Sequence, residues 1–397
     1  MTAAIRQYLV ITGNYWAFTL TDGALRMLVV LHFHQLGYSP LAIALLFVFY
    51  EFFGVVTNLF GGYLGARMGL NRTMNLGLFL QIAALAMLAV PAAALTVPWV
   101  MAAQALSGIA KDLNKMSAKS GIKLLVPDAE QARLYRWVAL LTGSKNTLKG
   151  VGFFLGGVLL MAIGFQGAVI AMASVLVLIW LASLVLLQQE LGRSKAKPKF
   201  TDILSKSRPI NLLSGARLFL FGARDVWFVV ALPVYLHTVF GWDFWQVGGF
   251  MASWVIGYGL VQTLAPRLTG DQAGRLPAVL WATLLALIPA AIALGLITGV
   301  SPQVAVLGGL LLFGVLFAIN SSLHSYLIVS YARGDGVSLD VGFYYMSNAA
   351  GRLLGTVLSG WVYQRYGLEA CLWLSSGLIA LAALVATRLP EQRPVSA

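Results

Sequence analysis

Residues 111–123 read KDLNKMSAKSGIK, and within this stretch a lysine recurs at every fourth position. Residues four apart lie on the same side of an α-helix, so these lysines form one stripe along it. The chain around them is apolar enough for a membrane protein. Charged side chains within a membrane-spanning helix are costly and normally face a cavity, a partner or a substrate. A lysine stripe in such a helix therefore predicts a site for an anion.

The composition predicts an all-α integral membrane protein. Hydrophobic residues make up 59% of the chain and charged residues 10%, whereas soluble domains average ~25% charged residues. The mean hydropathy is +0.82. A spanning helix needs ~20 apolar residues, and about twelve such runs fill the chain and leave no room for a soluble domain. The runs lie at 7–36, 41–64, 74–92, 97–125, 136–162, 167–189, 209–238, 246–266, 277–298, 303–329, 339–364 and 370–387.

Other classes of function are disfavoured by the residues present. No nucleophile–base pair and no metal-ligand spacing stands out, so we expect no enzyme, cofactor or metal site. Cys371 is the only cysteine, which excludes an intramolecular disulfide. The formal charge of +13 would suggest nucleic acid as the partner of a soluble protein. Here many of the charges lie in short loops, where positive residues set the orientation in the membrane.

Basic residues lie mainly in alternate loops between the predicted helices. The opposite loops contain almost none, with Arg365 as the exception. The positive-inside rule then places both termini in the cytoplasm. The first apolar run leads into polar and charged residues rather than a small-residue cleavage site, so no cleavable signal peptide is expected. The basic loops and tail contain Arg67, Arg72, Arg133, Arg136, Arg193, Lys195, Lys197, Lys199, Lys206, Arg208, Arg267, Arg275, Arg333, Arg388 and Arg393.

The longest polar stretch falls at the middle of the chain and divides it into two six-helix halves. The halves are residues 1–190 and 209–397, and a basic cytoplasmic linker, 191–208, joins them. A weak internal repeat at an offset of about 200 residues supports this division. Folds with repeated halves bind substrate between the repeats near the membrane midplane. The repeated residues are Asp22, His34 and Gly37 in the first half, and Asp225, His237 and Gly241 in the second.

Charges within the predicted helices follow a period of three. Every third helix has none in its interior and can face lipid, whereas the others must be buried against a cavity. The candidate substrate-binding residues are Arg26, Lys111, Asn114, Lys115, Lys145, Lys149, Arg217, Arg224, His324 and Arg352, and the candidate proton carriers are Asp22, Glu51, Asp112 and Asp225.

Four of these lysines can lie near mid-membrane on two adjacent helices. With a rise of ~1.5 Å per residue from the turn between the helices, Lys115 is level with Lys145, and Lys111 is level with Lys149. Within the predicted helices the cations outnumber the acids by roughly two to one, and buried unpaired charge costs several kcal/mol per ion. Either an anionic substrate or a structural network with unprotonated lysines accounts for the surplus.

Some of the charges can pair with one another. The acids are then either proton carriers or members of fixed salt bridges. Lys119 and Lys123 lie closer to the cytoplasmic end, where we expect them to reach the lipid head groups. His324 is expected to be a hydrogen-bonded cavity residue. The expected pairs are Asp112 with Lys115, Asp22 with Arg26, and Asp225 with a neighbouring arginine.

Two other patterns concern packing. Aromatic residues within the helices could contact substrate, but core packing or interface anchoring is the expected role. Glycines with small-xxx-small spacing permit close contact between helices. The aromatic residues are Tyr15, Trp16, Trp227, Trp254, Tyr258, Tyr344 and Tyr345, and the glycine pairs are Gly61–Gly65, Gly152–Gly156 and Gly351–Gly355.

Residues 62–72 read GYLGARMGLNR and resemble the loop signature of the major facilitator superfamily, Gly-x-Leu-x-Asp-Arg-x-Gly followed by basic residues. Ala66 replaces the aspartate of that pattern, and Leu70 and Asn71 replace the basic pair. Three further stretches resemble the ArsJ family of organoarsenical efflux permeases within this superfamily. They are GNYWAFTLTDGALR at 13–26, ALSGIAKDLNKMSAK at 105–119 and LFGARDVWF at 220–228.

The resemblance covers essentially the whole chain and implies a fold, a substrate and a partner. The fold is the twelve-helix superfamily fold, in the inner membrane of a bacterium. The substrate is 1-arseno-3-phosphoglycerate, which glyceraldehyde-3-phosphate dehydrogenase forms from arsenate, and its efflux confers arsenic resistance. Such an ester carries several negative charges, which suit arginine forks and lysines.

We therefore expect a monomeric, proton-coupled antiporter that works by alternating access. One binding pole would be the four mid-membrane lysines, and the other would be the arginines of the second half. The alternatives are a permease or exchanger for other phosphorylated organic anions, and a membrane-embedded sensor or assembly factor without flux.

Overall fold

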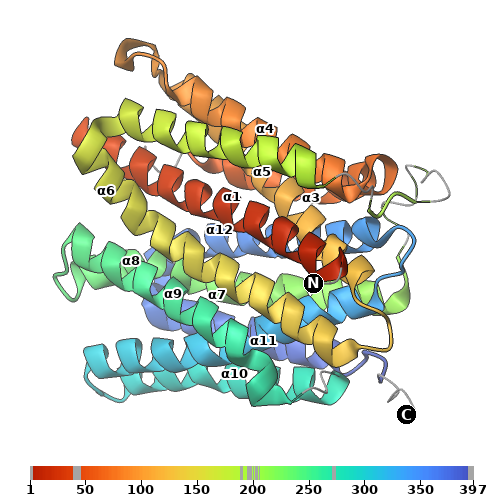
Figure 1. The fold of residues 1–397 in the computed structure, drawn as a ribbon. Coiled ribbons are helices and arrows are strands. Elements are labelled where there is room, and N and C mark those ends of the chain that lie inside the picture. The colour runs from red at the N-terminus through yellow and green to blue at the C-terminus, as the bar shows by residue number, and fades with distance from the viewer. Residues whose placement is uncertain are drawn as a thin grey trace. The chain divides into compact units, whose positions relative to one another are not determined.

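The computed structural model is built of helices (Figure 1). It describes residues 3–38, 46–187, 191–194, 199, 201, 204, 206–270 and 274–391, and these contain no strand. The long helices are α1 (Ala3–Gln35), α3 (Val48–Met68), α4 (Leu70–Leu88), α5 (Val97–Leu125), α6 (Gln131–Leu186), α7 (Arg208–Phe228), α9 (Phe244–Thr269), α10 (Arg275–Ile297), α11 (Gly309–Tyr331) and α12 (Val337–Ala386). The short ones are α8 (Ala231–Thr238), η1 (Ala92–Ala94) and η3 (Val304–Gly308).

The helices lie where the apolar runs predicted them. α6 and α12 each contain two predicted runs, separated by a glycine with positive φ, 71° at Gly164 and 79° at Gly367. Glycine adopts positive φ without the clash that a Cβ would cause, so the chain can turn there. α7 and α8 together form one run. Part of the second predicted run, 41–45, lies outside the described residues. By length and composition, six helical segments of the described chain could cross a membrane.

The helices pack as two compact units. The first comprises Met1–Pro127, Ser144–Ser205 and Ala332–Met346, and the second comprises Asp128–Gly143, Lys206–Tyr331 and Ser347–Ala397. α6 and α12 therefore contribute to both units. The division of the sequence into halves at the 191–208 linker stays a prediction.

In the first unit, α5 packs against α1, α3 and α4. A buried polar network links the helices around this core. Asn14 of α1 donates to the Ser183 hydroxyl of α6 at 2.8 Å, and Ser183 donates to Asn75 of α4 at 2.7 Å. The Trp180 indole also donates, at 3.1 Å, to the carbonyl of Asn75. Because buried polar groups without partners are costly, this network favours one arrangement of the three helices.

Glycines bring helices into backbone contact at equivalent places in the two units. In the first unit, a Cβ on Gly152 of α6 would lie 2.6 Å from the carbonyl oxygen of Leu20 in α1. In the second, a Cβ on Gly351 of α12 would lie 2.2 Å from the carbonyl oxygen of Leu218 in α7. No side chain fits there, so only glycine allows these crossings. The equivalent contact glycines, each pair 199 residues apart, are Gly23 and Gly222, Gly152 and Gly351, and Gly156 and Gly355.

The helices without interior charge expose large apolar side chains, as their sequences predict. α10 exposes Leu280, Leu287 and Leu294, and the second part of α6 exposes Leu178 and Val185. Apolar surfaces of this kind suit contact with lipid chains. They agree with the expectation that helices without interior charge can face lipid.

The turn between α3 and α4 contains the loop signature. Gly69, with φ of 96°, ends α3 and donates its backbone N–H to the carbonyl of Gly65 at 3.0 Å. Ala66, which stands where the pattern has aspartate, is buried, and its carbonyl accepts the N–H of Ser194 at 2.8 Å. A backbone contact to the start of the linker therefore forms at this turn, where the signature would place a carboxylate.

Candidate anion-binding site

The first unit contains a group of buried and half-buried charges that we call the lysine cluster. Its centre is Asp112, which is 1% exposed. One carboxylate oxygen of Asp112 lies 2.5 Å from Nζ of Lys115, and the other lies 3.8 Å from Nζ of Lys111. The expected pair of Asp112 with Lys115 therefore forms. The cluster consists of Lys111, Asp112, Lys115 and Lys119 of α5, Tyr50 of α3 and Tyr345 of α12.

Aromatic rings cover the lysines of this cluster. Nζ of Lys111 lies 3.8 Å from the centre of the Tyr50 ring. Lys115 and Lys119 share the Tyr345 ring, at 4.7 and 5.4 Å. A cation over an aromatic face gains ~0.5–2 kcal/mol. The rings thus stabilise the ammonium groups without adding a negative charge.

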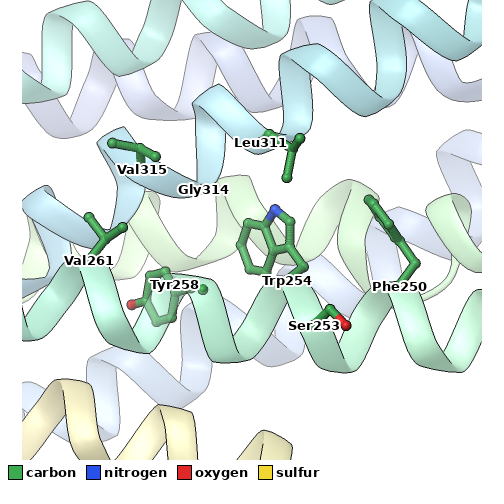
Figure 2. A pocket seen from close by; sticks show the side chains of 9 residues that line it. Phe250, Ser253, Trp254, Tyr258, Val261, Leu311, Gly314 and Val315 are labelled. Carbon is green, nitrogen blue, oxygen red and sulfur yellow. The ribbon is translucent and has the colours of Figure 1, made fainter.

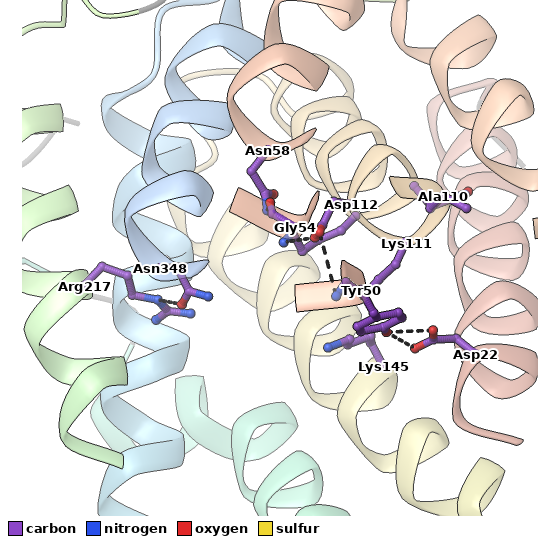
Figure 3. Close-up of polar contacts among 12 residues, drawn as sticks. Asp22, Tyr50, Gly54, Asn58, Ala110, Lys111, Asp112, Lys145, Arg217 and Asn348 are labelled. Carbon is purple, nitrogen blue, oxygen red and sulfur yellow. Dashed lines mark hydrogen bonds and ion pairs between the residues drawn. The ribbon is translucent and has the colours of Figure 1, made fainter. Parts of the chain in front are cut away.

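Tyr50 also connects the lysine cluster to α1 (Figure 3). Its hydroxyl lies 2.8 and 3.1 Å from the two carboxylate oxygens of Asp22. Arg26, which we expected to pair with Asp22, instead lies 3.5 Å from Glu51. The expectation was wrong because it considered one helix alone, whereas α3 offers a partner to each residue, Tyr50 to Asp22 and Glu51 to Arg26.

Lys119 and Lys123 are buried, whereas we expected them to reach the lipid head groups. Their residues are 3% and 8% exposed. The first part of α12 belongs to the same unit, and its Tyr345 covers Lys119. A helix distant in sequence, α12, therefore covers Lys119, which we had expected to extend towards the lipid head groups.

The remaining substrate-binding candidates of the first unit are Lys145, Lys149 and Asn114. Lys145 of α6 is half-buried and donates to the side-chain oxygen of Asn146 at 3.1 Å. Lys149 is half-buried too, and its carbonyl oxygen meets Gly23 where α6 crosses α1. Asn114 is fully buried, and its amide lies against Gly77 of α4, so the structure does not join it to the lysines.

The second unit contains an equivalent group, which we call the arginine cluster. Asp225, with no exposed surface, is held by two arginines. Nη2 of Arg224 lies 2.5 Å from one carboxylate oxygen, and Nε of Arg352 lies 3.0 Å from the other. The expected pairing of Asp225 with a neighbouring arginine therefore forms. The cluster consists of Arg217, Phe221, Arg224 and Asp225 of α7, and Asn348 and Arg352 of α12.

Arg217 is the most buried cation of the arginine cluster, at 3% exposed. It donates to the side-chain oxygen of Asn348 at 2.9 Å (Figure 3) and to the carbonyl of Ser321 at 3.3 Å. The Phe221 ring lies 3.9 Å from its guanidinium carbon and 4.9 Å from that of Arg224. As in the lysine cluster, one aromatic face serves two cations.

His324, one turn from Ser321 on α11, is 1% exposed. Its Nδ1 has no hydrogen-bond partner among the described residues. The side chain lies close enough to Arg217 to interact electrostatically. The structure therefore places His324 beside the arginine cluster, and its expected role as a hydrogen-bonded cavity residue stays a prediction.

Sequence reasoning missed Tyr50, Phe221 and Asn348. Tyr50 directly precedes the charged Glu51, and Phe221 lies between two arginines of the same helix, at positions 217 and 224. An aromatic residue next to a charge, or one turn from it, in an apolar helix is the signal that could have identified them. Asn348 has no such signal, because its contact with Arg217 depends on how α12 crosses α7.

The second unit also has a cavity of about 260 Å³ between α9 and α11 (Figure 2). Trp254 and Tyr258 line it on one side, and Gly314 allows the indole of Trp254 to approach closely. None of its lining residues is charged. An anion would find no cationic side chain there, so the two clusters remain the candidate sites.

The fold and the buried charges define a multi-pass membrane protein with ionic sites inside its helical bundle. Residues 9–339 match the family model described as Major Facilitator Superfamily, and the chain belongs to this family. The members of this family are transporters rather than enzymes, and the protein is accordingly a membrane transporter with the all-helical fold of the family. No curated protein sequence matches the chain significantly.

Several solved structures share the fold over nearly the whole chain. The human organic anion transporter TETRAN has 19% sequence identity and a TM-score of 0.77, with 97% of this chain and 100% of that chain covered. The E. coli fucose:proton symporter has 14% identity and a TM-score of 0.77, with 98% and 100% covered. The proton:xylose symporter XylE has 16% identity and a TM-score of 0.76, with 98% and 96% covered. Similarity at these identities concerns the fold.

Proposed function

We propose that the protein exports the organoarsenical 1-arseno-3-phosphoglycerate and so lowers the arsenic content of the cell. The observation that carries this proposal is the excess of positive charge inside the helices. The lysine cluster has three cations and one acid, and so has the arginine cluster. Because net charge away from water is costly, an anion is the ligand that such clusters stabilise best. The stretches at 13–26, 105–119 and 220–228, which resemble the ArsJ family, support the arsenical as that anion.

The proposal assigns roles to the candidate residues. Substrate oxygens would be bound by Arg26, Lys111, Lys115, Lys145, Lys149, Arg217, Arg224, His324 and Arg352, and protons would be carried by Asp22, Glu51, Asp112 and Asp225. Asn114 faces α4 and is left out of this set. We place the protein as a monomer in the bacterial inner membrane, with both termini cytoplasmic. A glyceraldehyde-3-phosphate dehydrogenase would supply the ester.

A permease or exchanger for other phosphorylated organic anions is the second candidate. The cations of the clusters are lysine and arginine side chains, which bind phosphate and carboxylate oxygens as readily as arsenate oxygens. One protein with a similar fold is described as an organic anion transporter. Competition between substrates would separate this candidate from the first.

Arsenate tolerance tests the proposal. An efflux-deficient bacterium would carry the gene with and without a co-expressed glyceraldehyde-3-phosphate dehydrogenase, and its arsenic content would be measured. We expect tolerance and lower cellular arsenic only when both proteins are present. No protection, with the protein shown to be in the membrane, would remove the arsenical and leave the second candidate. No flux of any phosphorylated anion would instead favour a membrane-embedded sensor or assembly factor.

A further inference from the structure

Tyr50 makes two contacts of different chemistry. Its hydroxyl donates to the carboxylate of Asp22, 2.8 Å from the nearer oxygen, and its ring face lies 3.8 Å from the ammonium group of Lys111 (Figure 3). Tyr50 is 2% exposed and Asp22 is 5% exposed, so little water reaches these contacts. One side chain thus joins a candidate proton carrier on α1 to a candidate anion-binding lysine on α5.

Several other groups surround this connection. Arg26 and Glu51 form their own ion pair beside it, and Asp112 is shared by Lys111 and Lys115. Asp22 is therefore the carboxylate whose hydrogen bonds come from Tyr50. The titratable and charged groups around Asp22 are Tyr15 and Arg26 of α1, Tyr50 and Glu51 of α3, Lys111 and Asp112 of α5, and Lys145 of α6.

We propose that Tyr50 couples a proton on Asp22 to an anion at Lys111, so that the protein takes up the two together. This inference rests on the proposed function, since it assumes that the lysine cluster binds an anionic substrate. It adds the coupling residue and the sign of the coupling.

The sign follows from the charges. An ionised Asp22 draws the Tyr50 hydroxyl proton towards itself, which raises the electron density of the ring and strengthens its attraction for Lys111. A proton on Asp22 removes that negative charge and frees Lys111 to bind an anion. Conversely, an anion at Lys111 makes a nearby carboxylate more costly and favours its protonation. By linkage, both effects are one coupling free energy.

This coupling differs from the antiport expected from the sequence. Antiport requires that anion and proton compete for the protein, whereas the groups around Tyr50 make them bind cooperatively. The inside-negative membrane potential would then drive export, because it acts on the negative charge that the substrate retains after one proton joins it.

Isothermal titration calorimetry of the full-length protein in lipid nanodiscs tests the inference. The probe is 2,3-bisphosphoglycerate, a stable doubly phosphorylated glycerate. Titration in two buffers with different heats of ionisation yields the protons exchanged per bound anion. We expect the wild-type protein to take up protons as it binds.

Two substitutions separate the two contacts of Tyr50. Tyr50→Phe keeps the ring and loses the hydroxyl, so we expect affinity to remain within about threefold of wild type while the proton uptake is lost. Tyr50→Leu also loses the ring face that competes for Lys111, so it too should lose the proton uptake, and we expect it to bind the anion no more weakly than Tyr50→Phe does. Tyr135→Phe is the matched control, since it loses a buried hydroxyl 3.0 Å from Thr269 in the second unit, and it should change neither quantity.

The outcomes distinguish this inference from the proposed function. If Tyr50→Phe takes up as many protons as the wild-type protein, the inference is overturned and the proposed function is not. Proton release by the wild-type protein on binding would have the same consequence. Absence of binding to the folded wild-type protein would overturn the proposed function, and the inference with it. Asp22→Asn cannot take up a proton and must also lose the uptake, so the test stays decisive if Tyr50→Phe does not fold.

Discussion

Replacement of Asp225 by asparagine tests whether one carboxylate holds the arginine cluster together. Asp225 is fully buried between Arg224, at 2.5 Å, and Arg352, at 3.0 Å. Removing one partner of a fully buried ion pair costs ~3–5 kcal/mol. The side chains of Arg224 and Arg352 are 14% and 29% exposed, so water screens part of the effect. We expect Asp225→Asn to lower the free energy of unfolding by about 2–4 kcal/mol.

The free energy of unfolding would be measured by denaturation with sodium dodecyl sulfate in mixed micelles. Asp243→Asn is the control, because Asp243 caps the start of α9 at the surface and asparagine caps a helix as well as aspartate does. The double variant Asp225→Asn with Arg352→Gln should lose less stability than the two single variants together, since the second change removes a charge left without its carboxylate. An Asp225→Asn protein within about 0.5 kcal/mol of wild type would refute the reasoning.

Three further predictions concern transport and packing. Substitution of both Lys111 and Lys145 by alanine should abolish transport and leave expression intact, and full activity would contradict the site assignment. Gly355→Ala should destabilise by more than about 2 kcal/mol, because the new Cβ would lie 2.5 Å from a carbonyl of α7, whereas Gly360→Ala in the same helix meets nothing within 4 Å and should stabilise by about 0.5–1 kcal/mol. Ser183→Ala breaks two buried hydrogen bonds and should cost about 1–3 kcal/mol, measured as above; an unchanged free energy would contradict the proposed network.

The positions of the helices could be predicted from sequence because they depend on local composition. The run at 97–125 coincides with α5, and the break between the two spans of α6 falls at Gly164, between the predicted runs. A stretch of about 20 apolar residues has few alternatives to a helix in a membrane, since its backbone must satisfy its own hydrogen bonds. Tertiary packing therefore had little influence on where the helices begin and end.

The contacts of the charges could be predicted only within a single helix. Asp112 and Lys115 pair because three residues separate them on α5. Arg26 pairs with Glu51 of α3, and Lys119 contacts the ring of Tyr345 of α12. Both contacts depend on how two helices are rotated about their axes. Periodicity shows which residues share a face, but not which face of another helix they meet.

The aromatic rings of the two clusters stabilise cations in a way that differs from that of carboxylates. A cation within a helical bundle needs stabilisation, and an adjacent carboxylate would provide it but would also compete with an anionic substrate. Tyr345 lies beside both Lys115 and Lys119, and Phe221 lies beside Arg217 and Arg224, so each ring stabilises two cations, of which Lys115 and Arg224 are also paired with a carboxylate. The rings therefore add stabilisation without adding to the negative charge of either cluster. A transporter must also release its substrate, and an aromatic face can take back the cation when the anion leaves.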